Sequence, residues 1–365
     1  MSWSVIIGHE EPLARLRAAL EAGRLHPALL FEGPGGVGKR LVALTLARAL
    51  HCPRAPERGG DPCGACRACL AIMESADPAR TVENQSLHPG VRVVSLSRPD
   101  ERELRFGAAS SRGEIRSQIT VSQIRAVLAE GAVGRSQGPP RVVIIDPADR
   151  MGESAANALL KTLEEPRPGE RFVLVTARPS ALLPTILSRC ARVRFGLLPR
   201  AALERALEPR AGAAARGGGR AKIDLILALA GGRIGSALAL LEGPALDSFR
   251  QTRSLLLESF AARARGLPPG TFAVVGAAAM GTREREEWLE AIGVLELLLR
   301  DLAVLAADPN AEAVNFDIRD ELARLAPILG ERAARALPRL DAVRGEFRVN
   351  VNARLAFEKI LLESG

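Results

Sequence analysis

A short apolar run that leads through a glycine-rich loop into a helix constrains this chain more than any other feature of its sequence. The run is 27–31 (PALLF), the loop 33–38 (GPGGVG) holds four glycines, and 41–50 carries apolar residues at helical spacing. This order predicts a buried strand, a sharp turn and a helix whose first backbone N–H groups face the loop. Such groups bind phosphate well, and Lys39 at the end of the loop could reach the same anion. A plain glycine turn between strand and helix is the simpler alternative.

Two further apolar runs extend the predicted sheet. They are 141–146 (RVVIID) and 171–176 (RFVLVT), and a helical pattern at 154–165 lies between them. Alternating strands and helices are typical of βαβ units, so the expected fold class is α/β with a parallel sheet. The stretch 81–117 is rich in Arg, Ser, Gly and acidic residues and is expected to be a long excursion, which could contain a strand at 91–95.

The sequence changes character after Phe195. Helical patterns rich in Ala, Leu and Arg replace the strand patterns, and a Gly/Ala/Arg patch at 211–219 is expected to be a loop. The patterns at 282–305 and 318–362 are expected to pack as a separate all-α unit. A length of 365 residues suits two or three domains.

Composition narrows the class of protein. Hydrophobic residues make up 47% of the sequence and charged residues 25%, which is the balance of a globular protein. The N-terminus lacks the basic region and apolar stretch of a secretion signal, and no apolar run reaches the roughly 18 residues of a membrane span. A cytoplasmic protein with no membrane partner is therefore expected. The net charge of +8 weakly favours an anionic partner such as DNA or a nucleotide.

The glycine loop departs from a phosphate-binding loop at one position. Ser or Thr is expected after the loop lysine because its hydroxyl binds Mg²⁺, and this chain has Arg40 there. Magnesium-dependent hydrolysis is therefore not expected at this loop, while nucleotide binding stays open. The residues assigned to nucleotide binding are Gly33, Gly36, Gly38, Lys39 and Asp146.

A second departure follows the strand 141–146. Its last residue, Asp146, could hold Mg²⁺ as the Asp of a Walker B strand does. Active ATPases of this kind have a Glu next, which polarises the attacking water, and this chain has Pro147 instead. The next carboxylate belongs to Asp149, three positions after Asp146. A second part of a hydrolytic site is thus missing from its usual place.

Four cysteines predict a metal site. Cys52, Cys63, Cys66 and Cys69 lie within 18 residues, and four thiolates at this spacing suit a tetrahedral Zn²⁺. A disulfide is disfavoured in a cytoplasmic protein. Because four protein ligands leave no coordination position open, the zinc is predicted to be structural.

The residue spacing of two short stretches does not by itself indicate a functional site. Residues 157–166 (NALLKTLEEP) predict an amphipathic helix that Pro166 ends, and all of its apolar positions could be core. Residues 184–190 (PTILSRC) could be a helical turn with an exposed Arg189.

Taken together, these residues resemble the bacterial sliding-clamp loader family of AAA+ proteins. The loop 33–39, the four cysteines after its helix, 157–166 and 183–190 (LPTILSRC) occur in the family's order and cover about the first 195 residues. A Ser-Arg-Cys sequence together with a zinc module is specific to these loaders, whereas a phosphate loop alone is not.

The resemblance implies three domains. They are an AAA+ nucleotide-binding-like domain at 1–197 with the zinc module at about 50–72, a helical lid domain at 198–245, and a helical collar at 246–365 that joins a five-subunit ring. The implied partners are the gamma/tau and delta subunits of the loader, the sliding clamp and primer-template DNA. The chain would then be a component of the DNA polymerase III holoenzyme, a DNA-directed DNA polymerase and nucleotidyltransferase.

The family's pattern also implies residue roles. The Arg of Ser-Arg-Cys projects into the ATP site of the neighbouring subunit, so Arg189 would act in trans as an arginine finger. Thr176 matches the family's sensor position.

The same pattern indicates the type of subunit. The gamma/tau motor subunits carry a Ser or Thr after the loop lysine, an acidic pair on the Walker B strand and a nucleotide-sensing Arg in the lid. This chain has Arg40, Pro147 and Gly235 at those positions, with Arg233 nearby. A chain that keeps Arg189 but lacks these residues of its own ATP site fits the delta-prime type, which is a non-hydrolysing stator. An active gamma/tau-type motor is the alternative, and an unrelated phosphate-loop nucleotide kinase is a third, for which no acceptor-site motif is found.

Overall fold

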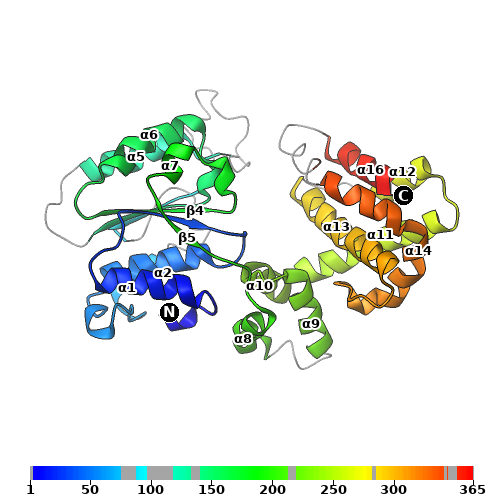
Figure 1. The fold of residues 1–365 in the computed structure, drawn as a ribbon, viewed down its shortest axis with the longest axis horizontal. Coiled ribbons are helices and arrows are strands. Elements are labelled where there is room, and N and C mark those ends of the chain that lie inside the picture. The colour runs from blue at the N-terminus through cyan, green and yellow to red at the C-terminus, as the bar shows by residue number, and fades with distance from the viewer. Residues whose placement is uncertain are drawn as a thin grey trace. The chain divides into compact units, whose positions relative to one another are not determined.

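Two compact units make up the chain (Figure 1). The computed structural model describes residues 3–74, 88–96, 118–132, 140–212, 219–281, 285–340, 343 and 352–364. The first unit comprises Met1–Ala206 with Gly232–Gly235, and the second comprises Leu207–Gly231 with Ser236–Gly365. Each unit is described by itself below.

The first unit is built on a five-stranded sheet with the order β2-β3-β4-β1-β5, and all neighbouring strands are parallel. The strands are β1 (Ala28–Glu32), β2 (Val91–Val94), β3 (Arg141–Ile145), β4 (Glu170–Thr176) and β5 (Ala191–Arg194). All residues of β1 and nearly all of β3 and β4 are buried, as expected for parallel strands that are covered on both faces. The predicted parallel sheet is confirmed, including the strand expected at 91–95.

Helices cover both faces of this sheet (Figure 1). One face packs against α1 (Glu10–Glu21), α2 (Lys39–His51) and α3 (Arg67–Glu74). The other packs against α5 (Val121–Ala132), α6 (Glu153–Glu164) and α7 (Pro184–Leu187). Short 3-10 helices complete the unit at Trp3–Val5, Pro56–Arg58, Ala148–Arg150 and Pro179–Ala181. Alternate residues of each strand serve the two faces, so that Val173 of β4 joins the first core and Leu174 the second.

The edge strand β5 was not predicted. Its sequence, Ala-Arg-Val-Arg, is half-exposed and lacks the apolar run of the inner strands. Arg192 and Arg194 instead both donate to the buried carboxylate of Glu32 on β1, at 2.6 and 2.8 Å. Burial alone would raise the pKa of Glu32, but the hydrogen bonds from the two arginines outweigh it and the pKa is lowered. Ion pairing with Glu32 therefore adds to the backbone pairing with β1 and to the partial packing of Ala191 and Val193 against the first core.

The second unit is helical throughout its described residues. Its helices are α9 (Gly219–Ala230), α10 (Ile234–Glu242), α11 (Ala245–Ala264), α12 (Pro269–Ala279), α13 (Arg285–Ala307), α14 (Arg319–Ala336) and α16 (Ala353–Ser364), with 3-10 helices at Phe316–Ile318 and Leu337–Arg339, and α8 (Arg200–Ala211) leads into the unit. The largest core lies among α11, α12, α13, α14 and α16. Its aromatic pairs are Phe260 with Phe272 and Trp288 with Phe357. Of the helices described, none combines the length and apolar character that crossing a bilayer requires.

A buried polar cluster fixes the connection between α13 and α14. Asp301 on α13 has no exposed surface, and its carboxylate accepts hydrogen bonds from the backbone N–H groups of Val314 and Asn315 at 3.0 and 2.8 Å. The Asn315 side chain donates to the same carboxylate at 2.8 Å. Arg253 on α11 then donates to Asn315 and, through two nitrogens, to Asp317. A single carboxylate thus ties the connection to its own helix.

We expect Asp301→Ala to lower the free energy of unfolding by about 3 kcal/mol, because it leaves buried N–H groups without an acceptor. Urea unfolding followed by Trp288 fluorescence in a Trp3→Phe background reports on this unit. Glu312→Ala is the matched control, since Glu312 is exposed in the same connection. Equal urea midpoints for the two variants would contradict the role of Asp301.

Candidate functional site

The glycine loop joins β1 to α2, as predicted, and its shape requires glycine. Gly33, Gly36 and Gly38 have φ angles of 142°, 76° and 105°, a region that residues with a side chain rarely adopt. A Cβ on Gly33 would also lie 2.0 Å from the carbonyl oxygen of Phe195. Gly38 is the N-cap of α2, so the loop leads into a helix N-terminus of the kind that binds phosphate.

Lys39 binds its own loop in this structure. Its Nζ donates to the carbonyl oxygens of Gly33 at 2.5 Å and Pro34 at 2.6 Å, and the residue is only 6% exposed. Burial lowers the pKa of Lys39, while the nearby charges of Asp146 and Asp149 act in the opposite direction. The ammonium group is therefore occupied by the loop itself.

Arg40 brings a cation to the place where a magnesium site would need an oxygen ligand. Its Nη1 lies 3.4 Å from Oδ2 of Asp146, the residue after β3. Burial raises the pKa of Asp146, and the charge of Arg40 opposes that shift. A guanidinium donates hydrogen bonds and has no lone pair for a metal, so the residue types at this position do not fit the magnesium site of an ATPase.

The carboxylate of Asp149 is also engaged. Its Oδ1 accepts a hydrogen bond from the Thr176 hydroxyl at 2.9 Å, and its Oδ2 accepts two from Arg178 at 3.1 and 3.0 Å. Burial alone would raise the pKa of Asp149, but these hydrogen bonds outweigh it and the pKa is lowered. Asp149 is thus an ion-pair partner, and the sensor candidate Thr176 is bound to it. Sequence reasoning missed Arg178, whose only signal is its position two residues after β4.

Gly235 lies directly on the glycine loop. Its backbone N–H donates to the carbonyl oxygen of Gly36 at 2.8 Å, and a Cβ on Gly235 would lie 3.3 Å from the Gly36 Cα. The neighbouring Arg233 is exposed. The backbone of Gly235 therefore contacts the loop at the position where a sensing arginine is expected in a motor subunit.

The four predicted metal ligands lie together. The Sγ atoms of Cys52, Cys63, Cys66 and Cys69 are all within 4.8 Å of one another, and those of Cys52 and Cys66 are 4.0 Å apart. A zinc ion with four thiolates about 2.3 Å away would need sulfurs about 3.8 Å apart, so the cluster fits a tetrahedral ion closely. Backbone N–H groups of Cys63, Cys66 and Cys69 donate to the sulfurs of Cys52, Cys63 and Cys66, which stabilises thiolates. These residues could hold a metal ion.

The cysteine module is anchored to the start of the chain. Cys52 follows α2 directly, and Cys69 lies on α3. The indole N–H of Trp3 donates to the carbonyl oxygen of Gly60 at 3.0 Å, and the Trp3 backbone N–H donates to Asp61 at 2.8 Å. Trp3 is 3% exposed, so its surroundings report on the module.

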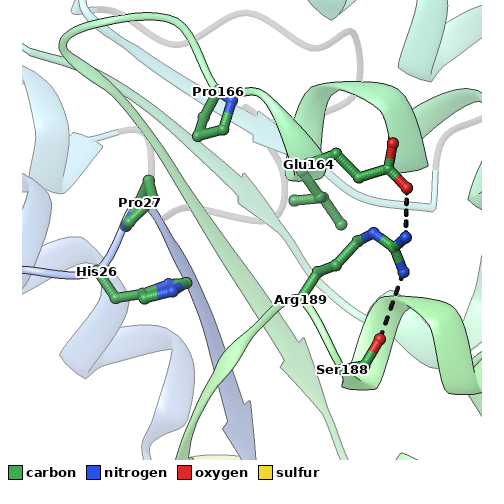
Figure 2. Close-up of a pocket in the computed structure, with 7 residues that line it drawn as sticks. His26, Pro27, Glu164, Pro166, Ser188 and Arg189 are labelled. Carbon is green, nitrogen blue, oxygen red and sulfur yellow. Dashed lines mark hydrogen bonds and ion pairs between the residues drawn. The ribbon is translucent and has the colours of Figure 1, made fainter.

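Arg189 lies at a separate pocket of about 510 Å³, lined by His26, Pro27, Leu163, Glu164, Pro166, Ser188 and Arg189. Figure 2 shows its guanidinium between Glu164 and Ser188. Nη2 forms an ion pair with Glu164, while Nη1 donates to the carbonyl oxygen of Thr185 at 2.8 Å and to the Ser188 hydroxyl at 3.3 Å. The partner Glu164 was not predicted from the sequence.

The pocket and the glycine loop lie at opposite ends of the strands. His26 and Pro27 come just before β1, and Arg189 comes two residues before β5, whereas the loop follows the end of β1. Asp146 and Thr176 lie at the carboxyl ends of β3 and β4, on the side of the loop. Parallel strands of five residues separate the two ends by about 16 Å. The structure therefore does not bring Arg189 to the chain's own loop.

Residues 8–198 match the family described as DNA polymerase III, delta subunit, which is more than half of the chain. The chain belongs to this family. The matched region of the family member includes the glycine loop, the four cysteines and Arg189.

The proteins that this chain is similar to carry related names. The chain is 33% identical to the DNA polymerase III subunit gamma/tau of Mycobacterium bovis over 199 residues, which cover 54% of this chain and 29% of that protein. It is 36% identical over 191 residues to the subunit delta' of Bacillus subtilis, or 52% of this chain and 48% of that protein. The chain thus spans half the length or less of these relatives. A gamma subunit-related protein of Thermotoga maritima is similar with a TM-score of 0.42 at 17% identity, over 95% of this chain and 97% of that one.

Proposed function

We propose that this chain is the delta-prime subunit of a bacterial clamp loader, which supplies Arg189 to the ATP site of a neighbouring subunit. The position of Arg189 supports this proposal most strongly. It lies at the amino ends of the strands, about 16 Å from the chain's own loop, beyond the reach of an arginine side chain. A finger placed there can serve only a nucleotide bound by another chain.

We propose further that the chain does not hydrolyse ATP itself. Lys39 is bound to its own loop, Arg40 approaches Asp146, and Pro147 replaces the water-activating acid. Asp149, the nearest other carboxylate, is held by Thr176 and Arg178. Among the described residues at this end of the sheet, Asp146 and Asp149 are each paired with an arginine, so neither carboxylate replaces the missing base.

The alternative is an active gamma/tau-type motor subunit of the same loader. One observation favours it: the glycine loop, with its positive φ angles, leads into the N-terminus of α2, where Lys39 is the first helical residue. Such a loop supports nucleotide binding but not the activation of water, so the stator remains the better proposal.

The wider assignments follow from the same proposal. We assign 1–197 to an AAA+ domain, 198–245 to a lid and 246–365 to a collar that joins a ring with gamma/tau and delta subunits. The work of such a ring is to load the sliding clamp onto primed DNA in the cytoplasm during replication. The four cysteines hold zinc as a structural ion in this proposal.

Hydrolysis of ATP by the purified chain, alone and then mixed with motor and delta subunits, clamp and primed DNA, tests the proposal. We expect no turnover by the chain alone and stimulated turnover in the complete mixture. Turnover by the chain alone that is lost on Lys39→Ala would make it a motor subunit instead.

A further inference from the structure

The guanidinium of Arg189 is held from two sides before any partner is present. Glu164, the last residue of α6, forms an ion pair with Nη2, and the hydroxyl of Ser188 accepts from Nη1 (Figure 2). The carbonyl of Thr185 also accepts from Nη1. The Thr185 and Ser188 contacts come from the turn that also carries Arg189. Glu164 is therefore the one side chain from another element that fixes the guanidinium, among the contacts formed by described residues.

The contacts leave part of the guanidinium available. An arginine side chain has five N–H groups, and the three hydrogen bonds within the described part of the chain use three of them. Two N–H groups remain for an anion, while the side chain is 31% exposed and its direction is already set. A cation that is already oriented loses less conformational entropy when it meets a phosphate.

We propose that Glu164 is the positioning residue of the Arg189 finger. The inference rests on the proposed role of Arg189 in trans. Glu164 does not contact the neighbour's nucleotide in this proposal. It holds the guanidinium in the direction from which the two remaining N–H groups reach the terminal phosphate.

The Glu164 carboxylate has two opposing effects on the rate of ATP hydrolysis. Their relative sizes decide whether removing it slows or speeds the reaction. Its charge partly cancels that of Arg189 and so weakens the attraction to phosphate. The carboxylate side chain is 47% exposed, and ion pairs at such sites change equilibria by less than about tenfold. A misplacement of a reacting group by about 1 Å costs about a hundredfold in rate. Positioning is the larger effect, so removing the carboxylate slows hydrolysis.

The test uses phosphate release by a reconstituted loader after mixing with ATP, clamp and primed DNA. The kinetic phase that Arg189→Ala removes identifies the ATP site that the finger serves. We expect Glu164→Ala to slow this phase about thirtyfold and Glu164→Gln about threefold, because the Gln amide oxygen still accepts a hydrogen bond. The ATP concentration that gives half of the maximal rate of this phase should change less than twofold, since the finger acts on the reaction and not on ATP binding.

Glu165→Gln is the matched control, because Glu165 is the adjacent exposed carboxylate, whereas the guanidinium of Arg189 contacts Glu164, Thr185 and Ser188. The double variant Glu164→Ala/Arg189→Ala should behave as Arg189→Ala does, since a positioning residue has no effect once its partner is gone. Incorporation of each variant into the loader is checked by gel filtration.

The outcomes separate this inference from the proposed function. If Arg189→Ala removes a phase and Glu164→Ala leaves that phase unchanged or faster, the positioning role is wrong while the finger stands. If Arg189→Ala removes no phase, the finger itself is wrong. An equal slowing by Glu164→Ala and Glu165→Gln would also overturn the positioning role, because it would reflect the loss of surface charge alone.

Discussion

Arg189→Ala is expected to lower the rate of hydrolysis about a thousandfold at one ATP site of the assembled loader. An arginine finger in trans stabilises the charge that develops on the transferred phosphoryl group, and its loss has effects of that size in other phosphate-loop enzymes. Sites served by the fingers of other subunits keep their rates. The amplitude of the fast phosphate-release phase should therefore fall by about one ATP per loader.

Two further variants make this result specific. Arg189→Lys keeps the charge but loses the planar fork, so we expect it to restore less than about a tenth of the lost rate. Arg167→Ala removes an exposed arginine from the connection between α6 and β4 and should leave every phase unchanged. An unchanged amplitude of the fast phosphate-release phase in a loader with Arg189→Ala would contradict the role of Arg189 as a finger. A reduced amplitude with Arg167→Ala would indicate a general effect of positive charge.

The core of the first unit could be predicted because its signals are local. The apolar runs that became β1, β3 and β4 are continuous and buried on both faces, and the glycines of the loop adopt the φ angles that only glycine tolerates readily. The strand β5 carries no such run. Its arginines pair with Glu32, which is about 160 residues away in sequence, and no local pattern encodes that pairing.

The candidate sites also divide into those encoded by a short stretch of sequence and those that depend on residues far apart in it. The cysteine cluster was predictable because its four ligands lie within a short stretch. The partner of Arg189 was not, because Glu164 lies 25 residues earlier in a helix whose pattern indicates only core packing. Arg40 was recognised as a departure, but its approach to Asp146, 106 residues away, needed the structure. Of the predicted excursion at 81–117, only residues 88–96 lie within the described part of the chain.

Removing one metal ligand is expected to release the zinc and loosen only the cysteine module. We expect about one zinc per purified chain and less than about a tenth of that in Cys66→Ser, because three thiolates bind structural zinc far more weakly than four. Metal content by mass spectrometry checks this result. Acidification should have the same effect, since protons compete with zinc for the thiolates.

Trp3 reports whether the module stays in place. It is bound to Gly60 and Asp61 inside the module, so in a Trp288→Phe background its emission should move to longer wavelength when the metal is lost. The sheet should remain folded, because its core on α2 and β1 is built from apolar side chains outside the module. The far-ultraviolet circular dichroism of Cys66→Ser should accordingly stay close to that of the parent chain.

Cys190→Ser separates the metal from the mere loss of a cysteine. Cys190 is buried in the second core of the sheet, away from the four-cysteine cluster, and burial raises the pKa of its thiol to about 11. Its replacement places a hydroxyl in an apolar core and should cost stability without releasing zinc. Zinc retained in Cys66→Ser, or lost equally in both variants, would contradict the four-cysteine site. Zinc lost from Cys66→Ser with an unchanged Trp3 spectrum would show instead that the ion does not hold the module against the N-terminal segment.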